Sequence, residues 1–275
     1  MINQIKSDYY KLRHSRMLFA VSCAYFCIFL LYVVLYAYGP KTGVSFMASG
    51  GETTGTLGFF VKTYSDMNSP TFWEICRSVM SNTIFFWMVA AVFTVMYLSK
   101  EYRYGTIKLS VAYGISKSKI FLSKFLITVC YTGICYYLMA FLSLAFTLLK
   151  THYCLRLNNF GKFMLYTSLN FLVLIVFILL CLLVELFLKN IAYSVTLMYL
   201  FIFAGLVFVD ASWATHQSWT LIENALARIN PSYYWLRICG YSHTNIEIET
   251  IIYFIIGSVL LFWVTGLILK KQEIK

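Results

Sequence analysis

Residues 17–38 read MLFAVSCAYFCIFLLYVVLYAY, a run of 22 residues without a charged side chain. A helix needs about 20 apolar residues to cross about 30 Å of hydrocarbon. The run begins only after sixteen residues, it is longer than the apolar part of a secretory signal, and no small-residue cleavage site follows it. We therefore predict a retained membrane-spanning helix.

The composition extends this interpretation to the whole chain of 275 residues. Hydrophobic residues make up 60% and charged residues 12%, whereas soluble domains usually carry about 25% charged residues. Five further apolar runs are long enough to cross a bilayer, and Lys189 and Asn190 separate the fourth span from the fifth. The six predicted spans are residues 17–38, 79–98, 125–149, 163–188, 191–209 and 251–269. The sequence thus predicts an all-α membrane protein, one transmembrane domain over residues 1–275.

The distribution of charge predicts the orientation. The formal net charge is +11, and with both termini in the cytoplasm fourteen of the 22 Lys and Arg residues lie on that side. Lys and Arg near the membrane concentrate in cytoplasmic loops. We expect a multi-pass protein of the plasma membrane, and the charge needs no nucleic-acid partner to explain it.

The first sixteen residues have one apolar helical face, formed by Ile2, Ile5, Tyr9 and Leu12 at steps of three and four. This pattern predicts an amphipathic helix that lies in the headgroup layer. The alternative is an ordinary positive flank that only sets the topology.

The predicted cytoplasmic segment between the second and third spans, residues 100–124, is long and basic. Gly105 and Gly114 bracket a partly amphipathic stretch, and glycine can supply a turn or a stop. A plain loop is the alternative, although a loop needs only a few residues to reverse direction. Ten of the fourteen cytoplasmic basic residues lie here or in the N-terminal helix.

The two predicted outer segments differ from each other. Residues 39–78 are rich in Gly, Ser and Thr and predict a loop, with a helix leading into the second span from about Phe72. Residues 210–250 predict a broken helical hairpin on or in the outer leaflet, with an amphipathic stretch at Leu221, Leu226 and Ile229. Asn230 and Pro231 break it, and the interfacial aromatic residues Tyr233, Tyr234 and Trp235 follow.

Motifs for catalysis or nucleotide binding are missing. The sequence contains no GxxxxGK[ST], GxGxxG, HExxH, GxSxG or CxxC. His243 and Glu247 have a helical spacing but no further ligands, so we expect a solvated loop there. We predict no catalytic residue, no metal site and no cofactor in this chain, while a disulfide among Cys76, Cys154 and Cys239 stays open.

Glu185 is the one acid within or against a predicted span. Lys189 follows it by four residues, so we expect the two side chains to pair and to reach toward the cytoplasmic end. A role for Glu185 in a proton relay is the alternative.

Three stretches together resemble the six-helix permease subunits of type-2 ABC transporters (ABC-2), including the bacitracin-resistance and lantibiotic-immunity permeases. They are IKSDYYKLRHSR (5–16), EYRYGTIKLSVAYGISKSKIFLSK (101–124) and NPSYYW (230–235). The middle stretch is similar to the coupling segment of that family, although members often have a proline where this chain has Tyr113 and Gly114. The residues that the resemblance assigns to coupling are Glu101, Arg103, Gly105, Thr106, Lys108, Gly114, Lys117 and Lys119, with Lys124 at the start of the third span.

The resemblance implies that a separate ATP-binding cassette subunit carries ATP and Mg²⁺ and that a second permease subunit completes the transporter. It also implies an outer gate at Asn230, Pro231, Tyr233, Tyr234 and Trp235. The implied activity is export or expulsion of an amphiphilic substrate such as an antimicrobial peptide. An ion-coupled carrier and a non-transporting membrane sensor of peptides are the alternatives, and a carrier would need more polar residues in its spans.

Overall fold

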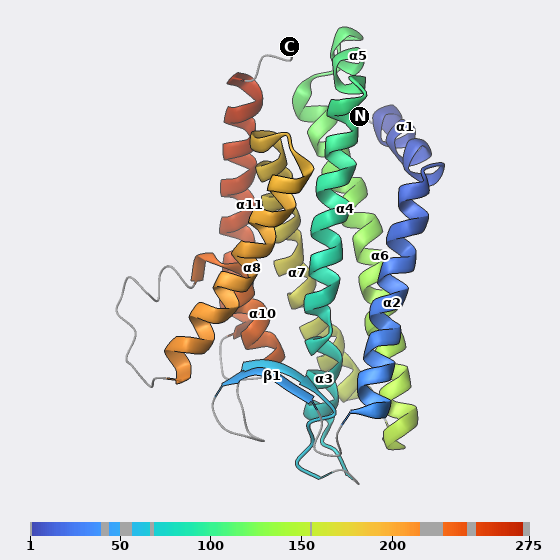
Figure 1. The fold of residues 1–275 in the computed structure, drawn as a ribbon, viewed down its shortest axis with the longest axis vertical. Helices are drawn as coiled ribbons and strands as arrows, with labels where there is room; N and C mark the ends of the chain where they lie inside the picture. The colour runs from blue at the N-terminus through green and yellow to red at the C-terminus, as the bar shows by residue number, and fades with distance from the viewer. Residues whose placement is uncertain are drawn as a thin grey trace.

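The computed structural model describes residues 2–39, 44–49, 57–66, 69–154, 156–214, 228–240 and 246–271. Most of these residues are helical, and the long helices run side by side along one axis (Figure 1). The helices are α1 (Ile2–Arg13), α2 (Arg16–Tyr38), α3 (Phe72–Ser81), α4 (Thr83–Arg103), α5 (Thr106–Ala112), α6 (Lys117–Thr151), α7 (Leu157–Leu188), α8 (Ile191–Ala214), α10 (Pro231–Gly240) and α11 (Ile246–Lys271).

Five helical stretches in the described part of the chain are long and apolar enough to cross a membrane. They are Arg16–Tyr38, Phe72–Arg103, Lys117–Thr151, Leu157–Leu188 and Glu247–Leu269. These stretches confirm a multi-pass membrane protein. The sixth predicted span falls on α8, of which only Ile191–Gly205 is described with its side chains as an apolar helix, so this span stays a prediction.

The predicted break between the fourth and fifth spans is confirmed. α7 ends at Leu188, and Lys189 takes a left-handed conformation with φ 50°. The Asn190 side chain then accepts a hydrogen bond from the backbone N–H of Ala192 at 3.0 Å. Asparagine in this position satisfies an N–H group that the first turn of α8 leaves without a helical partner.

The prediction of a plain loop for residues 39–78 is wrong. Strands β1 (Val44–Ser49) and β2 (Leu57–Val61) form an antiparallel pair in which Val44 faces Val61 and Phe46 faces Phe59. β-branched and aromatic residues favour strands, and this local signal outweighs the many glycines and serines around it. The hairpin lies at the end of the bundle opposite α5, and β2 contacts α3 and α10 (Figure 1).

Burial differs sharply between the helices. In the most apolar 18-residue window of each span, 72% of the residues are buried for α3–α4 and 56% for α7, against 6% for α11. The first two therefore form the centre of the bundle. The exposed face of α11 is apolar, which suits lipid contact.

Polar side chains inside the bundle pair with one another. The Tyr32 hydroxyl is fully buried and lies 2.6 Å from Thr147 Oγ1 and 3.1 Å from Ser78 Oγ. It thereby links α2, α3 and α6 near the β-hairpin end. Such contacts satisfy groups that would otherwise lose hydrogen bonds on burial.

We expect Tyr32→Phe to lower the free energy of unfolding by about 0.6–1.5 kcal/mol, because Thr147 and Ser78 lose a partner. Thermal unfolding in detergent measures this change. Tyr38→Phe is the control, since Tyr38 lies on the same helix and is 86% exposed. Equal effects of the two changes would contradict a structural role for the Tyr32 hydroxyl.

Candidate functional site

A buried ionic cluster lies where α1, α4 and α6 meet. Lys124 Nζ lies 2.7 Å from Asp8 Oδ1 and 3.0 Å from Glu101 Oε1. The side chains of Asp8 and Lys124 are fully buried, and that of Glu101 is 12% exposed. Buried charges are tolerated only when they are paired and hydrogen-bonded. We call Asp8, Glu101 and Lys124 the ionic cluster.

Neighbouring groups complete the hydrogen bonds of the cluster. Ser123 Oγ donates to Asp8 Oδ2 at 2.6 Å, and Gln4 Nε2 donates to the same oxygen at 3.3 Å. Lys124 Nζ lies 4.6 Å from the ring centre of Tyr97, within the range of a cation–π interaction. Lys11 adds a second cation, 3.7 Å from Glu101 Oε1, so that two acids and two lysines balance in charge.

The same cluster holds the start of α5. The Thr106 hydroxyl donates to the Glu101 carboxylate, and it lies 3.3 Å from the Glu101 carbonyl oxygen. Thr106 is the first residue of α5. The ionic cluster therefore connects the predicted coupling segment to α1, α4 and α6 through Glu101.

The two predicted glycine turns are present on either side of α5. Gly105 has φ 65° and Gly114 has φ 80°, a backbone conformation that other residues rarely adopt. They let the chain leave α4, form the short helix, and turn back into α6. A short helix, α5, thus lies at the end of the bundle within the segment where the sequence predicts coupling (Figure 1).

The predicted coupling residues fall into two groups. Glu101 and Thr106 point inward to the cluster, and Lys117 Nζ donates to the Leu269 carbonyl oxygen near the end of α11 at 3.4 Å. Arg103, Lys108 and Lys119 are exposed instead. Three apolar or aromatic side chains are exposed beside them, namely Tyr104, Leu109 and Tyr113.

Asp8, which the sequence pattern did not single out, lies on the face of α1 that is buried against the bundle. Tyr9, expected on the apolar face, is 57% exposed, while Asp8 and Leu12 are buried. Asp8 precedes Leu12 by one helical turn, so the spacing alone predicts that the two side chains share one face of α1. The burial of Asp8 depends on Lys124, which lies 116 positions later.

Glu185 and Lys189 do not pair as expected. Glu185 Oε2 accepts a hydrogen bond from Ser194 Oγ at 2.6 Å, and Lys189 Nζ lies 5.9 Å from the ring centre of Tyr102. The left-handed conformation of Lys189 takes its side chain off the helical repeat that would align it with Glu185. Glu185 thereby links α7 to α8.

The second half of the predicted outer hairpin is described, and its aromatic side chains lie inside the protein. Tyr233, Tyr234 and Trp235 on α10 are all buried. Trp235 Nε1 donates to Thr83 Oγ1 at 2.7 Å, at the start of α4. The aromatic residues pack into the bundle, because α10 lies against α7, α8 and β2. Leu221, Leu226 and His243 lie outside the described residues.

Asn230 and Pro231 form the start of α10. Asn230 Oδ1 accepts from the backbone N–H of Ser232 at 2.9 Å, and Pro231 takes the first helical position, where no N–H is needed. Asn230 Nδ2 donates to the Phe201 carbonyl oxygen on α8 at 2.9 Å. Burial raises the pKa of Tyr234 to about 12, so its hydroxyl stays neutral.

No group of three or more His, Cys, Asp or Glu residues that could hold a metal ion occurs in the described part of the chain. The sequence left open a disulfide among three cysteines. All three, Cys76, Cys154 and Cys239, are free in the structure.

We expect Lys124→Met to lower the free energy of unfolding by about 3–5 kcal/mol, because it leaves two carboxylates close together without their central cation. Adding Asp8→Asn restores part of the loss, because one uncompensated charge disappears. Unfolding in detergent measures both variants as a double-mutant cycle.

Lys119→Met removes an exposed lysine from the same helix and serves as the control for this cycle. A loss of stability as large as that of Lys124→Met, or strictly additive effects of Asp8→Asn and Lys124→Met, would contradict the cluster.

We expect Gly205→Ala to destabilise the protein by about 1–3 kcal/mol, because overpacking forces side chains to move. A Cβ at Gly205 would lie 2.3 Å from Asn230 Nδ2, which its hydrogen bonds hold in place. Gly161→Ala is the control within α7, where no atom lies within 4 Å of the added Cβ. Thermal unfolding in detergent compares them, and equal stability would refute the tight contact between α8 and α10.

Comparison with known proteins yields one family. The sequence profile of a family described as "ABC-2 family transporter protein" matches residues 4–205. No curated protein matches the sequence. The match covers well over half of the chain and includes the whole ionic cluster, so the protein belongs to the ABC-2 transporter family, whose members form the membrane-spanning permeases of ABC transporters.

Proposed function

We propose that this chain is a permease subunit that couples ATP hydrolysis by a partner to transport through the ionic cluster. Family membership implies an ATP-binding partner subunit. The observation that carries the proposal is the attachment of α5 to Glu101, whose carboxylate contacts both Thr106 and Lys124. A push on α5 would reach α1, α4 and α6 through one set of charged groups.

The outward side of the α5 region suits a docking surface. Tyr104, Leu109 and Tyr113 are 77%, 58% and 84% exposed, and Arg103 and Lys108 lie among them. Aromatic residues and arginine are enriched where proteins bind one another. We define this docking surface as Arg103, Tyr104, Lys108, Leu109 and Tyr113.

The orientation follows from charge and topology. The ends of α1 and α11 lie at the same end of the bundle as α5 (Figure 1), which requires an even number of crossings. Five helical stretches are long and apolar enough to span a membrane, and in this proposal α8 would supply the sixth crossing. The excess of Lys and Arg at the α5 end favours the cytoplasm for that end and for both termini.

Transport itself would follow a rigid-body mechanism. Two copies of the permease with two ATP-binding subunits would form a path between the permease copies, and movement of α5 would rock the helices that the ionic cluster connects. Lys117, through its hydrogen bond to the Leu269 carbonyl, would carry the movement to α11.

The proposed substrate is an amphiphile such as an antimicrobial peptide, which the transporter expels from a bacterial plasma membrane. The resemblance to bacitracin-resistance and lantibiotic-immunity permeases motivates this choice. The predominantly apolar side chains of the spans also suit an amphiphile better than a small ion.

We expect Leu109→Asp to weaken complex formation with the cognate ATP-binding subunit about tenfold or more, because it places an uncompensated charge in a buried contact. Co-purification and ATP turnover of the assembled transporter measure the effect. Leu157→Asp changes a leucine that is 87% exposed and begins α7, and it is the control. Unchanged assembly and turnover in Leu109→Asp would rule out docking on this surface.

A further inference from the structure

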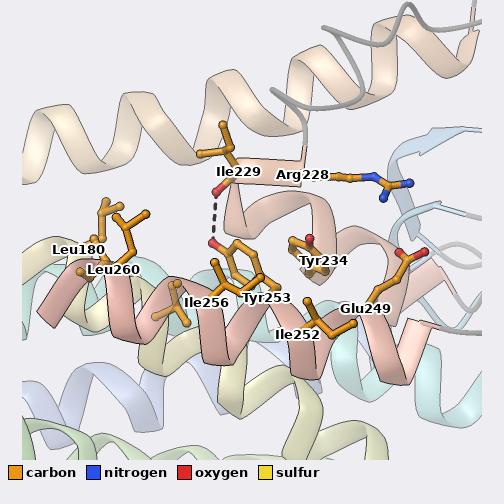
Figure 2. A pocket seen from close by; sticks show the side chains of 12 residues that line it. Leu180, Arg228, Ile229, Tyr234, Glu249, Ile252, Tyr253, Ile256 and Leu260 are labelled. Atoms are coloured by element: carbon orange, nitrogen blue, oxygen red, sulfur yellow. Dashed lines mark hydrogen bonds between the residues drawn. The ribbon is translucent and has the colours of Figure 1, made fainter. Parts of the chain in front are cut away.

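A groove lies along α11 at some distance from the ionic cluster. Its volume is about 390 Å³, and it is bounded by α7, by α10 together with Arg228 and Ile229 ahead of it, and by α11 (Figure 2). The floor is apolar and includes Val176 and Leu180 of α7. Ile252, Ile256 and Leu260 of α11 are each at least half exposed, so the groove is open to the surrounding lipid.

The two ends of the groove differ in chemistry. Arg228 and Glu249 lie at one end, while Leu180 and Leu260 lie at the other (Figure 2). From Glu249 to Leu260 an α-helix rises about 17 Å, close to half of the roughly 30 Å hydrocarbon core. The groove is therefore about as long as one leaflet is thick. Like a lipid molecule, it is polar at one end and apolar along the rest of its length.

The polar end carries an excess positive charge. Glu249 forms a salt bridge with Arg237, so its charge is already balanced. Arg228 is exposed and forms no ion pair within the described part of the chain. An anionic group at the groove entrance would complement this arginine, and arginine binds phosphate oxygens through two parallel hydrogen bonds.

The walls at the polar end are held in place before any ligand arrives. Tyr253 OH donates to the Ile229 carbonyl oxygen at 3.2 Å, and the rings of Tyr234 and Tyr253 stack with centroids 4.2 Å apart. Gly257 lets α11 approach α7 closely, since a Cβ there would lie 3.2 Å from a Val176 methyl group. A preformed site loses less free energy to ordering when it binds.

We propose that this groove binds an anionic phospholipid, with one acyl chain along α11 and the phosphate against Arg228. The net negative headgroup distinguishes this ligand from the zwitterionic lipids that could also fill the apolar part. The site is separate from the docking surface and does not depend on ATP hydrolysis.

The test measures lipids bound to the purified full chain by native mass spectrometry. The protein is incubated with equal amounts of dioleoyl phosphatidylglycerol and dioleoyl phosphatidylcholine. We expect phosphatidylglycerol to be retained about tenfold in excess, because both lipids present a phosphate to Arg228 but only phosphatidylcholine also brings a cationic choline group, which the arginine repels. Equal retention of the two lipids by the wild-type chain would overturn the proposal.

Two pairs of variants locate the binding. Arg228→Gln should abolish the preference for phosphatidylglycerol, whereas Arg156→Gln, which removes an exposed arginine outside the groove, should keep it. Ile256→Trp should fill the groove and reduce binding of both lipids about tenfold. Ile255→Trp, next to it on α11 but outside the groove, should not.

The variants also separate a lipid site from a contact between two copies of the chain. Loss of preference in both arginine variants would overturn the proposal. So would full lipid retention in Ile256→Trp, particularly if that variant instead changed the mass of the oligomer, which would identify this face as a subunit interface.

Discussion

A lysine enclosed by two carboxylates connects helices α1, α4 and α6. Lys124 is fully buried and bonds to Asp8 of α1 and Glu101 of α4. Removing a charge from water is costly, and only close opposite charges with further hydrogen bonds offset that cost. The positions of α1, α4 and α6 are therefore coupled, because a shift of any one would leave a buried charge without its partner. Thr106 extends the same constraint to α5.

The segment between α4 and α6 is longer than a simple connection requires. A reversal of direction would need only a few residues, but here the chain forms a separate helix between two glycine turns. Ile107 is buried against the bundle, while Leu109 and Tyr113 face outward. The inner side of α5 thus belongs to the fold, and the outer side is exposed, as the proposed docking surface requires.

Much of this architecture could be predicted from the sequence, because long apolar helices and glycine turns are local signals. The break at Lys189 and Asn190 and the bracketing of α5 by Gly105 and Gly114 follow from such signals. Contacts between distant residues could not be predicted. The burial of Asp8 depends on Lys124, and that of Trp235 on Thr83. The β-hairpin was not predicted, because the glycines and serines around it obscured a short strand pattern. The partner of Glu185 was also not predicted: it is Ser194, not Lys189 four residues later.

Hydrogen exchange of the α5 backbone amides tests most directly whether the ionic cluster holds α5 in place. The comparison is between Glu101→Ala, which removes the contacts to Thr106 and Lys124, and Arg103→Ala, an exposed change two residues away. Local opening determines exchange when global unfolding is rare. The account predicts faster exchange over Thr106–Ala112 in Glu101→Ala alone, with α11 unchanged. Exchange over α5 that matches the wild type in both variants would contradict it.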